Sequence, residues 1–132
     1  MRIVIVGVGR VGARLANILD ETHEVSLLDI DETAFRRIRA DFRGSTYRGN
    51  GIDVDTLRAA GATGADVLIA VTNGDNRNLM AAQVAKHVLG AHKVIARVYD
   101  PVRAAIFQDS GLETISPTIT GADRLYTQIL ET

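Results

Sequence analysis

The sequence contains no cysteine and only three histidines. The absence of cysteine excludes disulfide bonds, thiolate catalysis and zinc ribbons, and it fits a protein of the cytoplasm. The histidines His23, His87 and His92 are scattered along the chain, so neither a metal cluster nor a catalytic triad can be assembled from them. We therefore expect no metal site and no catalytic residue.

Long apolar runs are also absent. The longest stretch without a charged residue, 114–122, has nine residues, whereas a membrane helix needs about 20 apolar ones. The apolar N-terminus does not form a secretory signal, because Gly7, Gly9 and Arg10 interrupt it before an apolar core develops. We expect a cytoplasmic protein that reaches a membrane only through a partner.

Neither sign of charge dominates, and aromatic residues are scarce. Fifteen basic and 16 acidic residues give a net charge of −1, which excludes a general attraction to nucleic acid or anionic lipid. With only 5% aromatic residues, the core must be built from small aliphatic side chains, which suit helices packed closely on a sheet. The length of 132 residues predicts a single domain.

Short apolar runs alternate with amphipathic stretches along the whole chain. The runs predict buried strands, and the stretches, with apolar residues at helical spacing, predict helices. Asp75 or Asn73 is expected to cap the fourth helix. Strands are expected at 3–6, 24–29, 45–48, 66–71, 93–98 and 112–115, and helices at 10–20, 31–42, 53–60, 76–89, 101–109 and 119–130.

This strict alternation predicts an α/β fold, a doubly wound parallel six-stranded sheet with helices on both faces. Its two βαβαβ halves make a Rossmann fold the leading architecture. We expect residues 1–116 to form the Rossmann core and 117–132 a terminal dimerisation or crossover helix.

The expected terminal helix is apolar on two sides. Ile119, Ala122, Tyr126 and Ile129 form one stripe, while Leu125 and Leu130 lie off it. One side is expected to cover the sheet and the other to need a second surface, for which a second subunit is the simplest candidate. The alternative is a helix packed wholly within its own chain.

The stretch VIVGVGRVG at 4–12 is a dinucleotide-binding fingerprint. Gly7 permits a tight turn, Gly9 lets the backbone approach a phosphate, and Gly12 lets the helix pack on the strand. The motif alone is weak and would also fit an ordinary turn. Its position between a strand and a helix, where free N–H groups attract a pyrophosphate, favours nucleotide binding.

Asp29 ends the second expected strand, 17 residues after Gly12. The fingerprint places an acidic residue at about this distance, where it binds the ribose hydroxyls. A carboxylate there repels a 2′-phosphate, which favours NAD, ATP or ADP over NADP. Asp31 is a secondary contact or, as an alternative, the cap of the following helix.

Further polar residues follow the other strands. Arg10, inside the glycine loop, is expected to reach a terminal phosphate or a phosphate bound by a neighbouring subunit, or else to remain a solvated charge. The segment TNGDNRN at 72–78 follows the fourth expected strand, and GNG at 49–51 follows the third. Arg97 lies at the end of the fifth. The carboxyl ends of parallel strands share one edge, where open α/β sheets bind ligands.

The known catalytic motifs of nucleotide enzymes are missing. The chain has no GxxxxGK[ST] loop, and no tyrosine is followed by a lysine four residues later, which excludes the short-chain dehydrogenase pair. A ligand-gated binding module is therefore favoured. The alternative is the cofactor domain of an NAD-dependent oxidoreductase; a redox-sensing transcriptional regulator would need a DNA-reading helix that is not visible.

The segments GVGRVG, HEVSLLDID, GNG, ADVLIAVTNGDNRN and IARVYDP, with a late SP before the last helix, occur in this order. In this combination the whole chain resembles the N-terminal RCK (regulator of potassium conductance) domain of Trk/Ktr-type potassium-uptake regulatory subunits. The resemblance implies a homodimer that assembles into rings, binds NAD(H) and ATP or ADP (or AMP), and gates an integral-membrane potassium-translocating subunit at the inner face of the membrane.

The resemblance also extends the set of expected nucleotide contacts to the GNG triplet and to the loop after the fourth strand. Together the expected site residues are Gly7, Val8, Gly9, Arg10, Val11, Gly12, Asp29, Ile30, Asp31, Asn50, Gly51, Thr72, Asn73, Asn76 and Arg97.

The chain departs from the family pattern at two positions. Some relatives carry a glutamate after the late proline that helps to hold a divalent cation, but here Thr118 follows Pro117. Relatives often have Ser or Thr after the GNG-like triplet, where this chain has Ile52. Full regulators also carry a C-terminal subdomain that is not part of these 132 residues, so a fragment or a short natural form is expected.

Overall fold

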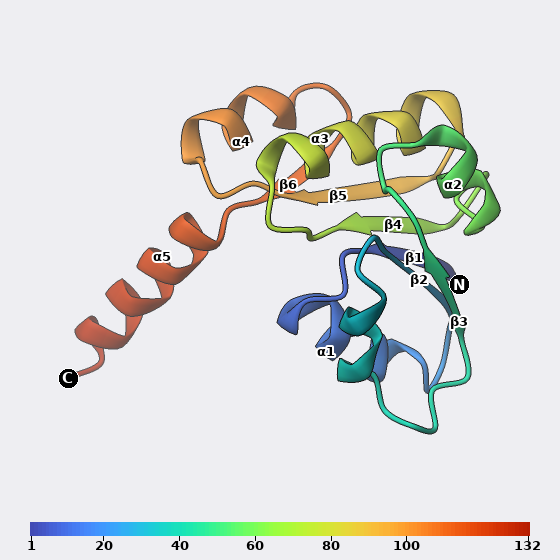
Figure 1. The fold of residues 1–132 in the computed structure, drawn as a ribbon. Coiled ribbons are helices and arrows are strands. Elements are labelled where there is room, and N and C mark those ends of the chain that lie inside the picture. Colours follow the sequence, from blue (N-terminus) through green and yellow to red (C-terminus); the bar gives the residue numbers. More distant parts are fainter.

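A computed structural model describes all 132 residues, and its six parallel strands form one sheet in the order β3-β2-β1-β4-β5-β6 (Figure 1). This is the strand order of the Rossmann fold, and the order reverses between β1 and β4. The prediction of a doubly wound parallel sheet is confirmed. The strands are β1 (Arg2–Val6), β2 (Glu24–Asp29), β3 (Ser45–Arg48), β4 (Val67–Ala70), β5 (Lys93–Arg97) and β6 (Glu113–Ile115).

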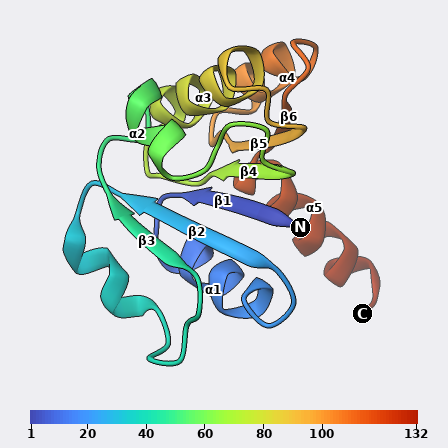
Figure 2. The same cartoon turned by 90° about the vertical axis from the view of Figure 1, so that its right-hand side faces the viewer.

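Helices cover both faces of the sheet, as Figures 1 and 2 show. Alternate residues of β1 serve the two faces: Val4 and Val6 belong to one buried cluster, and Ile3 and Ile5 to the other. Burial on both faces explains why the strands are continuously apolar. One face carries α2 (Val54–Ala59), α3 (Asp75–Gln83), its π-helical extension η2 (Val84–Val88) and α4 (Pro101–Gln108); the other carries α1 (Arg10–Leu19) and the 3-10 helix η1 (Glu32–Arg37).

The helix predicted at 31–42 is the main difference from the expected elements. Only η1 is helical there, because the chain turns extended at Ile38 (φ −85°, ψ 141°). Ile38 and Phe42 still pack against the buried cluster beneath α1. The backbone N–H of Arg39 donates to Asn17 of α1 at 3.2 Å. The apolar spacing therefore predicted correctly that Ile38 and Phe42 pack on the core, but it predicted a helix where the chain forms a loop.

The predicted side-chain cap of α3 is wrong. Gly74 occupies the N-cap position and no side chain bonds the free N–H groups of the helix. Asp75 instead accepts hydrogen bonds from the backbone N–H groups of Tyr99 (2.8 Å) and Asp100 (3.1 Å). Its carboxylate therefore ties α3 to the loop that follows β5.

The terminal helix α5 (Pro117–Leu130) projects away from the sheet (Figure 1). None of its residues is buried, so the expectation that one side covers the sheet is wrong. At its start, the hydroxyls of Ser116 and Thr118 both donate to the carbonyl of Tyr99 at 3.2 Å. No helix of the structure is both long and apolar enough to cross a lipid bilayer. Large apolar side chains exposed on α5 are Ile119, Leu125, Tyr126, Ile129 and Leu130.

Candidate functional site

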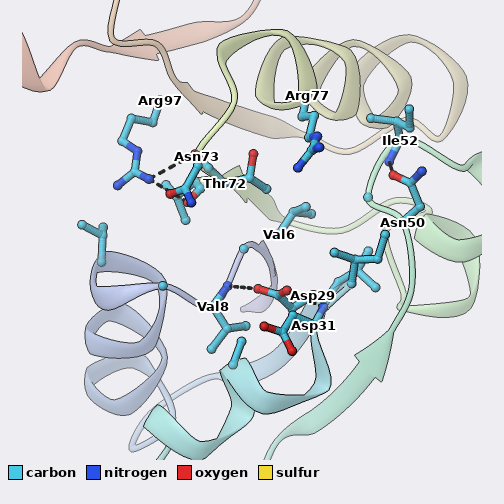
Figure 3. A pocket seen from close by; sticks show the side chains of 18 of the residues that line it. Val6, Val8, Asp29, Asp31, Asn50, Ile52, Thr72, Asn73, Arg77 and Arg97 are labelled. Atoms are coloured by element: carbon cyan, nitrogen blue, oxygen red, sulfur yellow. Dashed lines mark hydrogen bonds between the residues drawn. The ribbon is translucent and has the colours of Figure 1, made fainter.

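A cleft of about 900 Å³ opens at the carboxyl edge of the sheet (Figure 3). Loops that follow β1, β2, β3, β4 and β5 all line it, so both halves of the sheet contribute. The cleft spans the point where the strand order reverses, which is where open α/β sheets bind their ligands. Its volume lies within the usual range for ligand pockets, roughly 300–1,000 Å³.

The glycine loop brings α1 directly onto the end of β1. Gly7 has φ +102°, and a Cβ there would lie 2.8 Å from the backbone nitrogen of Thr72. A Cβ on Gly12 would collide with the carbonyl oxygen of Gly7. Gly9 is the N-cap of α1, no side chain caps this helix, and a Cβ on Gly9 would have no atom within 4 Å. The uncapped N-terminus of α1 therefore meets open space, as an anion site requires.

Asp29 joins the glycine loop to the end of β2. One carboxylate oxygen accepts from the backbone N–H of Val8 at 2.8 Å (Figure 3), and the other accepts from the N–H of Asp31 at 2.8 Å. Each carboxylate oxygen can accept a second hydrogen bond. Asp29 therefore fixes the loop and still has acceptor capacity for ribose hydroxyls.

Asp31 caps η1, so the capping alternative is confirmed for this residue. Its carboxylate accepts from the hydroxyl of Thr33 (2.8 Å) and from the backbone N–H of Thr33 (3.0 Å). These two bonds, the hydroxyl first, lower the pKa of Asp31 below its ordinary value. Asp31 also lines the cleft, and its secondary contact with a ligand stays a prediction.

Behind the cleft, Asn78 of α3 is fully buried and joins the ends of β4 and β5. Its Oδ1 accepts from the N–H (2.8 Å) and the hydroxyl (2.7 Å) of Thr72, while its Nδ2 donates to the carbonyls of Thr72 (3.0 Å) and Arg97 (2.8 Å). Asn78 lies within the polar segment 72–78, but the sequence did not predict a role for it. A signal existed, because Asn78 shares its helix face with the buried Ala81, Ala82 and Ala85.

Arg97 lines the cleft, but its guanidinium is partly committed to the protein. One terminal nitrogen donates to the carbonyls of Val71 (2.9 Å) and Thr72 (3.1 Å), as Figure 3 shows. The guanidinium carbon lies 5.1 Å from the ring centroid of Tyr99, a cation–π distance. Its Nε is buried without a partner. Arg97 thus braces the loop after β4 as well as facing the cleft.

Three further arginines line the cleft. Arg37 donates to the carbonyl of Val8 at 3.3 Å. The side chains of Arg10 and Arg77 are exposed and bond no other residue. Arg77 projects from the first turn of α3 toward the cleft (Figure 3). With only Asp29 and Asp31 as acidic lining residues, the cleft is electropositive and suited to phosphate.

All but two of the residues predicted for the site line this cleft. Gly12 is packed behind the loop, and Asn76 is absent from the lining and accepts a hydrogen bond from Arg103 of α4. No three His, Asp or Glu side chains lie close enough together to hold a metal ion. Lining residues outside the predicted set of site residues are Val6, Leu28, Ala34, Arg37, Gly49, Ile52, Val71, Arg77 and Tyr99.

Comparison with known proteins gives consistent matches over the whole chain. Residues 3–117 match the family model of the TrkA-N domain. The Trk system potassium uptake protein TrkA of Streptomyces coelicolor is 44% identical over 131 residues, which is 98% of this chain and 59% of that protein. A TrkA homolog of Methanothermobacter thermautotrophicus is 36% identical over 127 residues, 95% of this chain and 58% of that protein.

The chain therefore spans less than two thirds of the length of either relative. Among solved structures, GsuK bound to ADP is similar at a TM-score of 0.77 and 25% identity. That similarity covers 94% of this chain and 32% of the GsuK chain.

Proposed function

The chain belongs to the TrkA-N domain family, and from this premise we propose that it is a nucleotide-sensing regulatory domain of a potassium-uptake system. NAD(H) and ATP or ADP are the proposed ligands of the cleft, and their exchange alters how the domain acts on a membrane potassium-translocating subunit. The observation that carries the proposal is the hydrogen bond from the Val8 N–H to Asp29, which holds the proposed phosphate loop beside the proposed ribose acceptor. The potassium-uptake relatives and the ADP complex of GsuK support it.

The parts of the ligand follow from the cleft. The pyrophosphate is assigned to the uncapped N-terminus of α1, and the adenosine ribose to Asp29. The adenine is assigned to the loop after β3, where Asn50 accepts from the N–H of Ile52 at 3.1 Å and holds the turn. Because Asp29 repels a 2′-phosphate, NAD should bind more tightly than NADP.

Discrimination among nucleotides is assigned first to Arg10. It lies in the glycine loop, lines the cleft, and bonds no protein group. Arg97 is less suited to this discrimination, because its guanidinium already donates hydrogen bonds to two backbone carbonyls. A ligand shifts a conformational equilibrium only through differential affinity, so nucleotides that engage Arg10 differently would favour different arrangements.

The proposed assembly is a homodimer that builds larger rings in the cytoplasm, at the inner face of the membrane. The exposed apolar side chains of α5 support it, because a helix with no buried residue gains stability only against another surface. A second copy of the chain is the proposed cover.

The decisive experiment measures binding of NADH, NAD, NADP, ATP and ADP by titration calorimetry, with molar mass by light scattering for each complex. The proposal expects binding of NAD(H) and of ATP or ADP, weak binding of NADP, and a mass or shape that depends on the ligand. Tight NADP binding would contradict the role of Asp29. Substrate-dependent oxidation of NADH would instead support the oxidoreductase alternative.

A further inference from the structure

Asn78 is the most deeply buried polar side chain of the chain, and it touches the cleft only through the residues it bonds. We propose that Asn78 is a positioning residue for the phosphate side of the cleft: its amide locks the loop after β4 onto the end of β5 and holds Thr72 and Arg97 in place. This inference rests on the proposed function, because it requires a nucleotide in the cleft.

The bonding partners determine the orientation of the Asn78 amide. The backbone N–H of Thr72 can only donate, so Oδ1 must face it, and the carbonyls of Thr72 and Arg97 can only accept, so Nδ2 must face them. Each donor and acceptor of the Asn78 amide therefore bonds a group of the opposite kind. A side chain of another type cannot reproduce this pattern within the same volume.

The geometry explains why this lock acts on the phosphate side. The nitrogen of Thr72 lies only 2.8 Å from where a Cβ on Gly7 would be, so the loop after β4 abuts the glycine loop directly. Arg97 reaches back to the same Thr72 carbonyl that Asn78 bonds. If the loop moved, both Arg97 and the wall beside the pyrophosphate would move with it.

The adenosine side of the cleft makes no direct hydrogen bond to this lock. Asp29 ends β2 and Asn50 follows β3, on the other half of the sheet from β4 and β5. Neither residue hydrogen-bonds to Asn78 or Thr72. A ligand that contains only adenine and ribose should thus be indifferent to Asn78, whereas one with phosphates or a second nucleoside should not be.

The test compares adenosine, ADP and NADH binding, by titration calorimetry, to the wild type, Asn78→Ala and Asn78→Asp. Asn78→Asp keeps the shape and Oδ1 but replaces the donor, so it remains informative if the alanine variant does not fold. Leu89→Ala is the matched control, since it removes a buried side chain just after the C-terminal end of the same helical segment. In addition, amide exchange should accelerate at Thr72 but not at Val71, whose N–H bonds Val6.

We expect both Asn78 variants to weaken ADP and NADH by roughly tenfold or more and adenosine by less than about twofold. Leu89→Ala should lower stability without this difference among ligands. Equal losses for all three ligands, or unchanged affinities, would overturn the inference while leaving the proposed function intact. Failure of the wild type to bind ADP and NADH would contradict the proposed function itself, and this inference with it.

Discussion

Asp29 combines a structural role in the loops beside the cleft with the proposed role of ribose acceptor. Its two carboxylate oxygens hold the glycine loop and the start of the next loop, and each has a second acceptor site that points to no protein donor. Some arginines around the cleft bond the protein, and others remain available to a ligand. Arg97 bonds backbone carbonyls, whereas Arg10 and Arg77 have no protein partner.

Asp29→Asn should therefore weaken both folding and binding. An amide has one acceptor oxygen, so either Val8 or Asp31 loses its acceptor, which lowers the free energy of unfolding by about 1 kcal/mol. Affinity for NADH and ADP should fall roughly tenfold or more, as calorimetry and urea denaturation would measure. Asp41→Asn is the control, because that carboxylate pairs with Arg39 at the surface. Unchanged affinity for both ligands would remove Asp29 from the site.

Arg10→Ala should weaken ATP more than NAD, because a third phosphate adds charge for the guanidinium to meet. Stability should stay within about 0.5 kcal/mol, since the side chain bonds nothing in the protein. Arg14→Ala, one turn further along α1 and also exposed, is the matched control outside the cleft. Equal losses for ATP and NAD would show that Arg10 does not discriminate between them.

At the scale of elements, the spacing of apolar residues predicted the strands better than it predicted the helices. The strands at 24–29 and 45–48 were predicted to the residue. The 3-10 helix η1 was not, because the apolar positions Ile38 and Phe42 reach the core from a loop as well as from a helix. Asn78 was missed for a different reason: its partners lie on β5 and on the loop after β4, so its role depends on tertiary contacts.

The turn from β1 into α1 supplies a prediction at this scale. Gly9→Ala should leave stability nearly unchanged, since Gly9 has φ −80° and open space around a Cβ, but it should weaken every phosphate-bearing ligand. Gly12→Ala should reduce both stability and binding, because its methyl group meets the Gly7 carbonyl and pushes α1 off the sheet. Thermal unfolding and calorimetry separate the two effects. Similar stability losses for both variants would contradict this account of the loop.

At the scale of the whole molecule, α5 carries the apolar surface that the fold leaves uncovered. Ile129 is 67% exposed. In the proposed homodimer, Ile129→Glu should shift the equilibrium to monomer in light scattering, because association would have to bury the charge. Gln128→Glu adds the same charge at the neighbouring position and should have much less effect. A monomeric wild type, or equal effects of both variants, would exclude α5 as the association surface.

The helix α5 is attached to the body of the protein beside the cleft, so a small movement there can be enlarged at its far end. Its first residues are pinned to the carbonyl of Tyr99, and Tyr99 lines the cleft beneath Arg97. A rigid helix of 14 residues is about 21 Å long, so a rotation of about 5° at its root moves its tip by about 2 Å. If a ligand in the cleft shifted Tyr99, α5 would turn that small shift into a displacement of about 2 Å at its tip, which a subunit packed on the helix would follow.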